Sequence, residues 1–318
     1  MNYRTLLSTA SAVAMLYLAT PTFAADVSQI AFSADTAYPE SVTYSAKQHS
    51  FMVGSVRHGV VGKISIDGKY TPFITDKTLV SSLGLLVDDK TNTLWVTNSD
   101  PGASDHTDAA TQGKLAGVAT YDATTGEKKA YYDLGSLSEG AHLANDLILD
   151  KDGNAYVTDS FAPIIYKIDT KGKASIFVNN PLFNTGDAFK LNGITWLKDN
   201  HLLVGKWNTG ELYRVNVADP SDVQQVQLPE ALKGADGFHL VDEQHLIVAQ
   251  NAGVDRTVEL VSTDGWKSAK IDHQLKSVMS MPTAATEADG TIYVLNSRLD
   301  TLLDAKATKV SDYLLQKF

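Results

Sequence analysis

The stretch HLANDLILDKDGNAYVTDS (His142–Ser160) decides the fold, because variants of it recur along the chain. A polar pair, Asn145-Asp146, opens an apolar run of strand length, a tight turn of the Asp-Gly type follows at 151–153, and a second strand-like run ends in small polar residues. The same unit of two strands and a turn occurs five more times, at 39–55, 82–99, 191–207, 235–251 and 282–297.

The spacing of these units predicts a ring of similar blades. The second strands centre on valines separated by 43 to 47 residues, with one interval of 61 that a polar insertion at 100–116 explains. These valines are Val53, Val96, Val157, Val204, Val248 and Val294. A period of roughly 40–50 residues with about four strands is typical of propeller blades. A β-sandwich is the alternative, but it does not predict six similar units. The sequence therefore predicts an all-β fold, a six-bladed β-propeller.

The two ends of the chain are expected to close this ring. The sixth unit has no obvious fourth strand before the C-terminal SDYLLQKF, and the strand-like SQIAFS at 28–33 has no partner nearby in sequence. We expect this N-terminal strand to complete the last blade, because closure removes exposed sheet edges. Helical periodicity is possible only over 300–317. No linker is visible, so residues 25–318 are expected to form a single propeller domain.

The first 24 residues are typical of a signal peptide. Arg4 precedes a largely apolar run at 6–19, and Pro-Thr-Phe-Ala at 21–24 offers small residues for cleavage after Ala24. An uncleaved membrane anchor is the alternative, although the run is short for a membrane span. No later run has that length, so we expect a periplasmic or secreted protein that is free of the membrane.

Composition excludes several other functions. The chain has no cysteine, which excludes disulfides and thiol catalysis. Its 37 acidic and 27 basic residues give a net charge of −10, which argues against a nucleic-acid partner. The sequence contains neither a phosphate-binding loop nor the Gly-x-Ser-x-Gly motif of serine hydrolases. We expect a small-molecule partner and a monomer.

The residues that open the first strand of each unit are the candidate site. First strands line the central channel of a propeller, so these residues converge at one mouth. In four units the opening residue is acidic or an amide: Glu40, Asn145, Asn192 and Asp236. Two carboxylates and two amide carbonyls are ligands typical of Ca²⁺, although another divalent cation is possible. Asn-Gly and Asp-Gly are also common turn dipeptides, but here they share one phase of the repeat.

The motifs YPESVTY, ANDLILDKDG, LNGITW and ADGF resemble the metal-site motifs of the senescence-marker-protein/gluconolactonase family, the regucalcin-like calcium-dependent propellers. Paraoxonases and diisopropylfluorophosphatase are related to that family. The resemblance covers essentially all of the mature chain. It implies that Glu40, Asn192 and Asp236 are metal ligands and that Asn145 is a fourth ligand or a substrate-facing amide. Members that bind sugar lactones carry an arginine where this chain has Leu143, which favours a less polar lactone or ester.

These features together predict a calcium-dependent hydrolase of a lactone or related ester. The cation would polarise the carbonyl, and Asp236 or His142 would act as the general base. A non-catalytic exported propeller that binds a small molecule or a protein around a structural metal is the alternative. The insertion at 100–116 is expected to form either a lid or a disordered loop. Loops between second and third strands open at the same mouth, and they nominate six pocket residues: His58, Asn98, Phe161, Trp207, Asn251 and Arg298.

Overall fold

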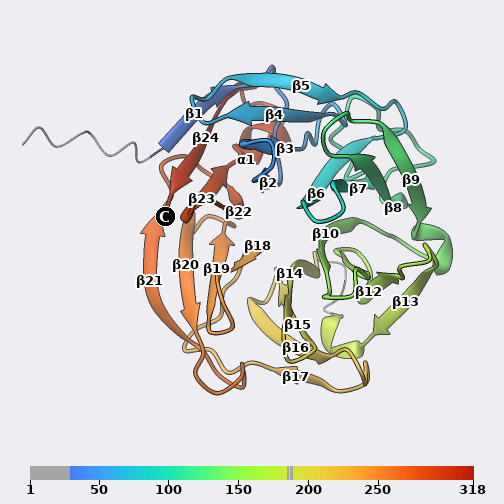
Figure 1. The fold of residues 1–318 in the computed structure, drawn as a ribbon, viewed down its shortest axis with the longest axis vertical. Helices are drawn as coiled ribbons and strands as arrows, with labels where there is room; N and C mark the ends of the chain where they lie inside the picture. The colour runs from blue at the N-terminus through green and yellow to red at the C-terminus, as the bar shows by residue number, and fades with distance from the viewer. Residues whose placement is uncertain (1–28, 185, 187–188) are drawn as a thin grey trace, which may run out of the picture.

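The computed structural model describes residues 29–184, 186 and 189–318. Six four-stranded antiparallel sheets are arranged as a ring around a central axis (Figure 1). This confirms the predicted six-bladed β-propeller. The signal peptide predicted at 1–24 lies outside the described residues. Within the part of the chain that is described, no helix has both the length and the apolar character needed to cross a membrane.

Each of the first five blades takes its strands in chain order from the channel outward, so that consecutive strands are hydrogen-bonded neighbours. Blade one consists of β2 (Val42–Ser45), β3 (Ser50–Val53), β4 (Val61–Ser65) and β5 (Tyr70–Ile74). Blade two consists of β6 (Ser81–Asp88), β7 (Thr93–Ser99), β8 (Ala116–Asp122) and β9 (Lys128–Asp133). Blade three consists of β10 (Ala144–Leu149), β11 (Ala155–Asp159), β12 (Ile164–Ile168) and β13 (Ala174–Asn179). Blade four consists of β14 (Leu191–Leu197), β15 (His201–Lys206), β16 (Glu211–Asn216) and β17 (Val223–Gln225). Blade five consists of β18 (Ala235–Leu240), β19 (His245–Gln250), β20 (Arg256–Val261) and β21 (Lys270–Lys276).

The sixth blade joins the two ends of the chain, as predicted. Its strands run from the channel outward as β22 (Pro282–Ala288), β23 (Thr291–Asn296), β24 (Asp312–Lys317) and β1 (Gln29–Ser33). The N-terminal strand β1 pairs antiparallel with β24 along its full length, from Gln29 opposite Gln316 to Ser33 opposite Asp312. The ring therefore has no open edge between its last blade and its first.

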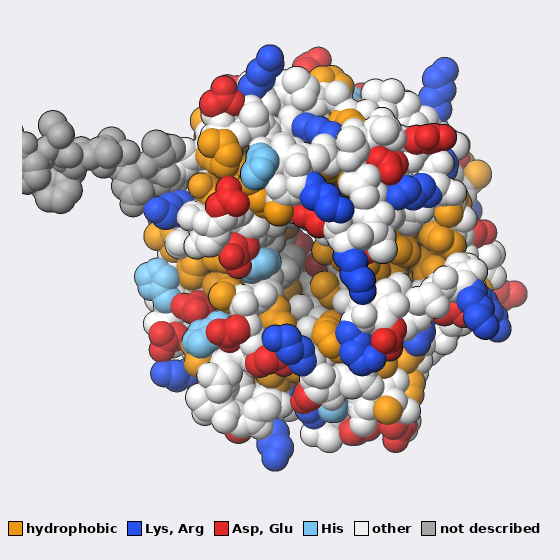
Figure 2. Space-filling model, in the orientation of Figure 1, with side chains coloured by type: hydrophobic (Ala, Val, Ile, Leu, Met, Phe, Trp, Pro, Cys, Tyr) orange, Lys and Arg blue, Asp and Glu red, His pale blue; other side chains and the backbone are white. Residues whose placement is uncertain are grey.

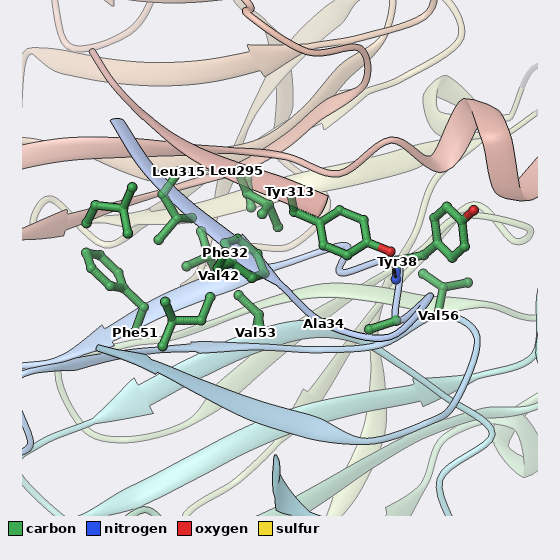
Figure 3. Packing of buried hydrophobic residues seen from close by; sticks show 14 of the residues in the cluster. Phe32, Ala34, Tyr38, Val42, Phe51, Val53, Val56, Leu295, Tyr313 and Leu315 are labelled. Carbon is green, nitrogen blue, oxygen red and sulfur yellow. Dashed lines mark hydrogen bonds between the residues drawn. The ribbon is translucent and has the colours of Figure 1, made fainter. Parts of the chain in front are cut away.

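Aromatic packing at this junction holds the ring closed. Phe32 and Tyr313 are buried in one cluster with residues of blade one, among them Phe51 (Figure 3). The Tyr313 hydroxyl accepts a hydrogen bond from the backbone N–H of Tyr38 at 2.9 Å and donates one to the carbonyl of Val310 at 2.9 Å. These bonds join the last blade to the segment that leads into the first, so ring closure is both apolar and polar.

Helical structure is short. The stretch 300–317 is helical only near its start, in α1 (Leu299–Leu303), and its end is the strand β24. The helical expectation for this stretch is therefore wrong beyond α1, because the C-terminal residues lie between β23 and β1 and hydrogen-bond to both. Two single-turn 3-10 helices, η1 (Gly135–Leu137) and η2 (Pro181–Phe183), connect neighbouring blades.

The insertion at 100–116 is folded onto the rim of the ring. The buried Asp100 carboxylate accepts hydrogen bonds from the backbone N–H of Gly102 and from the hydroxyls of Thr107 and Thr111, at 2.7–2.8 Å. Asp105 forms ion pairs with Arg57 and, when that ring is protonated, with His58. The insertion is thus an ordered loop bonded to blade one. Of the two predictions for this segment, a lid or a disordered loop, the structure does not support the disordered loop.

Candidate metal centre

Irregular starts of the inner strands aim the site residues into the channel. In five of the six inner strands the pairing with the next strand shifts register near the start of the inner strand, and in three of them the shift falls at a predicted site residue. In β10 the shift lies between Ala144 and Leu147, which releases Asn145 from the ladder. β14 shifts around Asn192 and β18 around Asp236 in the same way. Such bulges redirect a side chain, and here they point equivalent residues at one mouth.

Threonines of the second strands satisfy the backbone groups that the bulges leave unpaired. The Thr97 hydroxyl donates to the carbonyl of Asn145 at 2.6 Å and accepts from the N–H of Gly84 at 2.7 Å. The Thr158 hydroxyl donates to the carbonyl of Asn192 at 2.7 Å. Each threonine therefore fastens its own blade to the site residue of the next one, and the ligand positions are tied together around the ring.

Glycines beside the site residues let the inner strands approach closely. A Cβ atom on Gly193 would lie 2.2 Å from the carbonyl oxygen of Asp236, and one on Gly84 would lie 2.3 Å from that of Asn145. Gly237 stands in the same relation to Thr283. None of these glycines has a positive φ. The Asn-Gly and Asp-Gly pairs are thus not turns here, and their glycines are needed because any side chain would collide with backbone of the next blade.

Three of the four candidate ligands each have a buried side-chain oxygen without a hydrogen-bond partner among the described residues. These oxygens are Asn145 Oδ1, Asn192 Oδ1 and Asp236 Oδ1. The Asn145 amide is oriented by a hydrogen bond on its NH₂ group, because Nδ2 donates to Ser160 Oγ at 2.8 Å. Its amide oxygen is therefore left facing the cavity. An unsatisfied buried polar atom costs about 1–3 kcal/mol, so oxygens placed in this way are candidates for binding a cation.

The carboxylates of the site are held in an environment that disfavours their charge. Burial raises the pKa of Asp236 to about 8. The pKa of Glu40 is raised well above its usual value by burial and by the negative charges of Asp236 and Asp146. Asp146 is the third carboxylate of the channel, and burial raises its pKa to about 7. A bound cation would compensate these charges, so the donor set fits a hard divalent ion such as calcium.

No group of three or more His, Cys, Asp or Glu side chains suited to metal binding occurs among the described residues. The candidate centre therefore depends on its mixture of two carboxylates, Glu40 and Asp236, with the two amides, Asn145 and Asn192. Oxygen ligands of this kind suit calcium, whereas zinc and copper favour histidine and cysteine.

Asn251 links the metal centre to the pocket wall. Its Oδ1 accepts a hydrogen bond from Trp207 Nε1 at 2.9 Å, and its Nδ2 donates to Asp236 Oδ2. Both ends of this amide thus have hydrogen-bond partners, which gives Asn251 a supporting position beside the candidate ligands. By binding Oδ2 it leaves Oδ1 of Asp236 directed to the cavity.

Cavities open at both ends of the channel, and one face of the ring shows the hollow at its centre (Figure 2). The candidate ligands lie at the floor of a cavity of about 260 Å³ that also takes in Phe161, Trp207 and Asn251. The second cavity, about 340 Å³, is lined by later residues of the inner strands and by Asp146. The structure thus brings together the four predicted metal ligands and three of the six predicted pocket residues.

His142 lies outside this cavity. Its buried ring contacts Asp159 Oδ2 through Nδ1 at 2.8 Å and the carbonyl of Ser138 through Nε2 at 3.0 Å. The hydrogen bond with Asp159 raises the pKa of His142, and the Tyr166 hydroxyl donates to the same carboxylate at 2.8 Å. Both ring nitrogens are engaged in support of the loop, so this geometry gives the predicted catalytic role of His142 no support.

Three other predicted pocket residues also have structural partners elsewhere. His58 Nε2 lies 2.9 Å from the carbonyl of Asp35, which places the ring beside the N-terminal segment. Asn98 accepts from the N–H of Val80 at 2.8 Å and donates to the carbonyl of Thr78 at 2.9 Å. Arg298 precedes α1 in a left-handed conformation. None of the three lines the cavity at the metal centre.

Several lining residues were not predicted. They are apolar and come from the inner-strand starts and the connections around them: Val56, Leu83, Pro101, Leu143, Phe189, Met281, Leu299 and Leu303. Two of them had a signal in the sequence: Leu83 lies at the start of the first strand of its unit, and Leu143 stands where members of the resembled family that bind sugar lactones carry an arginine. The others have no assigned position in the repeat, so the pattern did not place them at the site.

Comparison with known proteins identifies the fold only. No protein-family model and no curated protein sequence matches the chain. Among solved structures, the major Malassezia sympodialis allergen Mala s 1 is 18% identical over 91% of this chain and 95% of its own, with a TM-score of 0.71. A protein described as a candidate gluconolactonase is 14% identical over 91% and 92%, with a TM-score of 0.62. A luciferin-regenerating enzyme is 12% identical over 91% and 95%, also at 0.62.

Proposed function

We propose that the protein is a calcium-dependent hydrolase that cleaves a lactone or a related carboxylic ester at this mouth of the channel. The observation that carries the proposal is the set of buried, unpartnered oxygens of Asn145, Asn192 and Asp236 beside the Glu40 carboxyl. Such oxygens are unfavourable alone, whereas a hard cation takes them as ligands. The description of one structural neighbour as a candidate gluconolactonase agrees with this choice of chemistry.

Glu40, Asn145, Asn192 and Asp236 would hold the cation at the pocket floor. When bound, the cation supplies polarisation of the substrate carbonyl and stabilises negative charge on its oxygen. The hydrogen bonds from Asn145 to Ser160 and from Asn251 to Asp236 would keep these oxygen ligands in place before substrate arrives, so little reorganisation is needed.

We assign the proton-accepting role to Asp236. Its carboxyl lines the pocket together with the other candidate ligands and, as a carboxylate, would accept the proton of the attacking water. The water oxygen forms a bond to the carbonyl carbon, and the bond from that carbon to the ring or ester oxygen breaks. The proton taken from water passes to the departing alkoxide. No histidine occurs among the described residues that line this cavity.

The test is hydrolysis of a lactone and ester panel by the purified protein, with calcium and with a chelator. The proposal expects turnover with calcium, its loss on chelation and its recovery when calcium is returned. Asp236→Ala should remove turnover together with calcium affinity. Calcium binding without hydrolysis of any member of the panel would instead favour a non-catalytic binding protein built around a structural metal.

We further propose that residues 1–24 direct export, that cleavage follows Ala24, and that the mature chain is a monomer in the periplasm or medium. The support is the apolar run and small residues at the N-terminus of the sequence. The mass of the mature chain recovered from cell fractions tests the cleavage site, and its sedimentation tests the monomer. A chain that keeps residues 1–24 would contradict the export proposal.

A further inference from the structure

One side of the cavity above the metal centre is a continuous aromatic wall, made of Phe161, Phe189 and Trp207. The rings of Phe161 and Phe189 are edge to face, with centroids 5.4 Å apart. Those of Phe189 and Trp207 are also edge to face, with centroids 5.7 Å apart. All three residues line the same cavity as the candidate ligands. A further ring can extend such an array, because edge-to-face and offset contacts between aromatic rings are favourable.

The aromatic wall is fixed relative to the metal centre. Trp207 Nε1 donates to Asn251, and Asn251 donates in turn to Asp236, so the indole and the ligand share one rigid amide. At the other end of the wall the backbone N–H of Phe161 donates to Asp159 at 2.8 Å. The carbonyl of Phe161 accepts from the buried Lys190 ammonium at 2.8 Å. A group lying on this wall would therefore be held at a set position beside the reacting carbonyl.

The remaining walls offer nothing to a hydroxylated substrate. Apart from Glu40, Asn145, Asn192, Asp236 and Asn251, every described residue lining the cavity is apolar, and the one polar atom of the wall, Trp207 Nε1, already bonds Asn251. A sugar hydroxyl buried there would lose its bonds to water without replacement, about a 10-fold loss of affinity for each. At about 260 Å³ the cavity is small for a ligand site and suits a small lactone that carries one further ring.

From these observations, and resting on the proposed function, we infer that the site takes lactones or esters that carry an apolar ring next to the reacting carbonyl and rejects polyhydroxylated sugar lactones. The aromatic wall of Phe161, Phe189 and Trp207 is the specificity-determining surface. Leu143 contributes to the same selection, because its buried side chain adds apolar surface to the cavity and offers no hydrogen bond to a hydroxyl.

The experiment measures binding separately from turnover. Lactams resist hydrolysis, so calorimetric titration with phenyl-substituted δ-valerolactam, plain δ-valerolactam and gluconolactam reports recognition alone, in calcium and in chelator. We expect the phenyl-substituted lactam to bind on the order of 10-fold more tightly than the plain one, and gluconolactam to bind more weakly than either. Phe161→Leu and Phe189→Leu should each reduce the phenyl preference while calcium affinity stays unchanged. Phe177→Leu, which removes a ring that packs on Tyr156 outside the cavity, is the matched control.

Two results would overturn the inference: gluconolactam binding as tightly as the phenyl-substituted lactam, or an unchanged phenyl preference in both wall variants with calcium binding intact. The wild-type ranking alone decides the first, so a variant that fails to fold does not remove the test. A phenyl preference without hydrolysis of any lactone would sustain the inference and reject the proposed enzyme. Calcium-dependent hydrolysis that favours gluconolactone would do the opposite.

Discussion

Replacing Asp236 by Asn is the most informative single change, because it removes one charge from the centre and almost no volume. Asp236 is buried, its Oδ1 has no partner among the described residues, and its Oδ2 accepts from Asn251. With calcium bound, the substitution removes one half of a buried charge pair. Such a truncation costs about 3 kcal/mol, which corresponds to an affinity loss on the order of 100-fold.

Without calcium the same substitution should stabilise the fold, and increasingly so at high pH. Burial raises the pKa of Asp236 to about 8, so the folded protein holds a proton that the unfolded chain releases near pH 4. The stability contributed by that proton is present below about pH 4 and is lost as the pH rises through about 8. Asn does not titrate. The free energy of unfolding of the metal-free variant should therefore increase relative to that of the metal-free wild type as the pH rises from about 5 to 8.5.

Thermal unfolding in chelator and in calcium, at both pH values, measures these two effects together. The wild type should gain a large calcium-induced increase in Tm at high pH, and Asp236→Asn should gain little. Asp152→Asn, on the exposed hairpin turn of blade three, makes the same chemical change away from the site and should behave as wild type. A calcium-induced shift of wild-type size in Asp236→Asn would refute the reasoning, as would metal-free Tm values of variant and wild type that change in parallel with pH.

Three further predictions follow from the same structure. Gly193→Ala should lower the free energy of unfolding by about 1–3 kcal/mol and weaken calcium binding, since the added Cβ would lie 2.2 Å from the carbonyl oxygen of Asp236. Denaturant unfolding and calcium titration measure the two effects. Unaltered values in both would contradict the close approach of β14 and β18. Calcium binding should release protons near pH 7, because Glu40, Asp146 and Asp236 all have raised pKa values and the ligands among them must bind as carboxylates. Calorimetry in buffers of different ionisation enthalpy measures the number of protons released. Equal apparent binding enthalpies in all buffers would contradict the prediction. Tyr313→Phe should lower the free energy of unfolding by about 1–3 kcal/mol, because it leaves the buried N–H of Tyr38 without its acceptor. Chemical denaturation measures this, with Tyr132→Phe in the outer strand β9 as the control. Equal stability of the two variants would show that the Tyr313 hydroxyl does not stabilise the closed ring.

The repeat made the fold and the convergence of the candidate ligands predictable, because both depend on phase. Residues that open equivalent strands must meet at one mouth once six units close into a ring, and Asn145, Asn192 and Asp236 share that position. The glycines after two of them resembled turn residues, since a dipeptide pattern cannot show that Gly193 faces the backbone of the next blade. That contact exists only between blades.

The pocket wall was only partly predictable for a related reason. Phe161 and Trp207 follow second strands and so share a phase, whereas Phe189 and Leu299 lie in connections whose course has no periodic signal. His142 looked like a base because it is close to Asn145 in sequence. In three dimensions the carboxylate of Asp159 holds its ring in the supporting layer behind Leu143.

The most direct test of the central claim is a crystal structure of the mature protein grown with calcium, with anomalous scattering to identify the ion. The account predicts one calcium at this mouth of the channel, about 2.3–2.6 Å from oxygens of Glu40, Asn145, Asn192 and Asp236. At saturating calcium, a mouth without an ion, or an ion bound by other residues while these amide oxygens stay unpartnered, would contradict it.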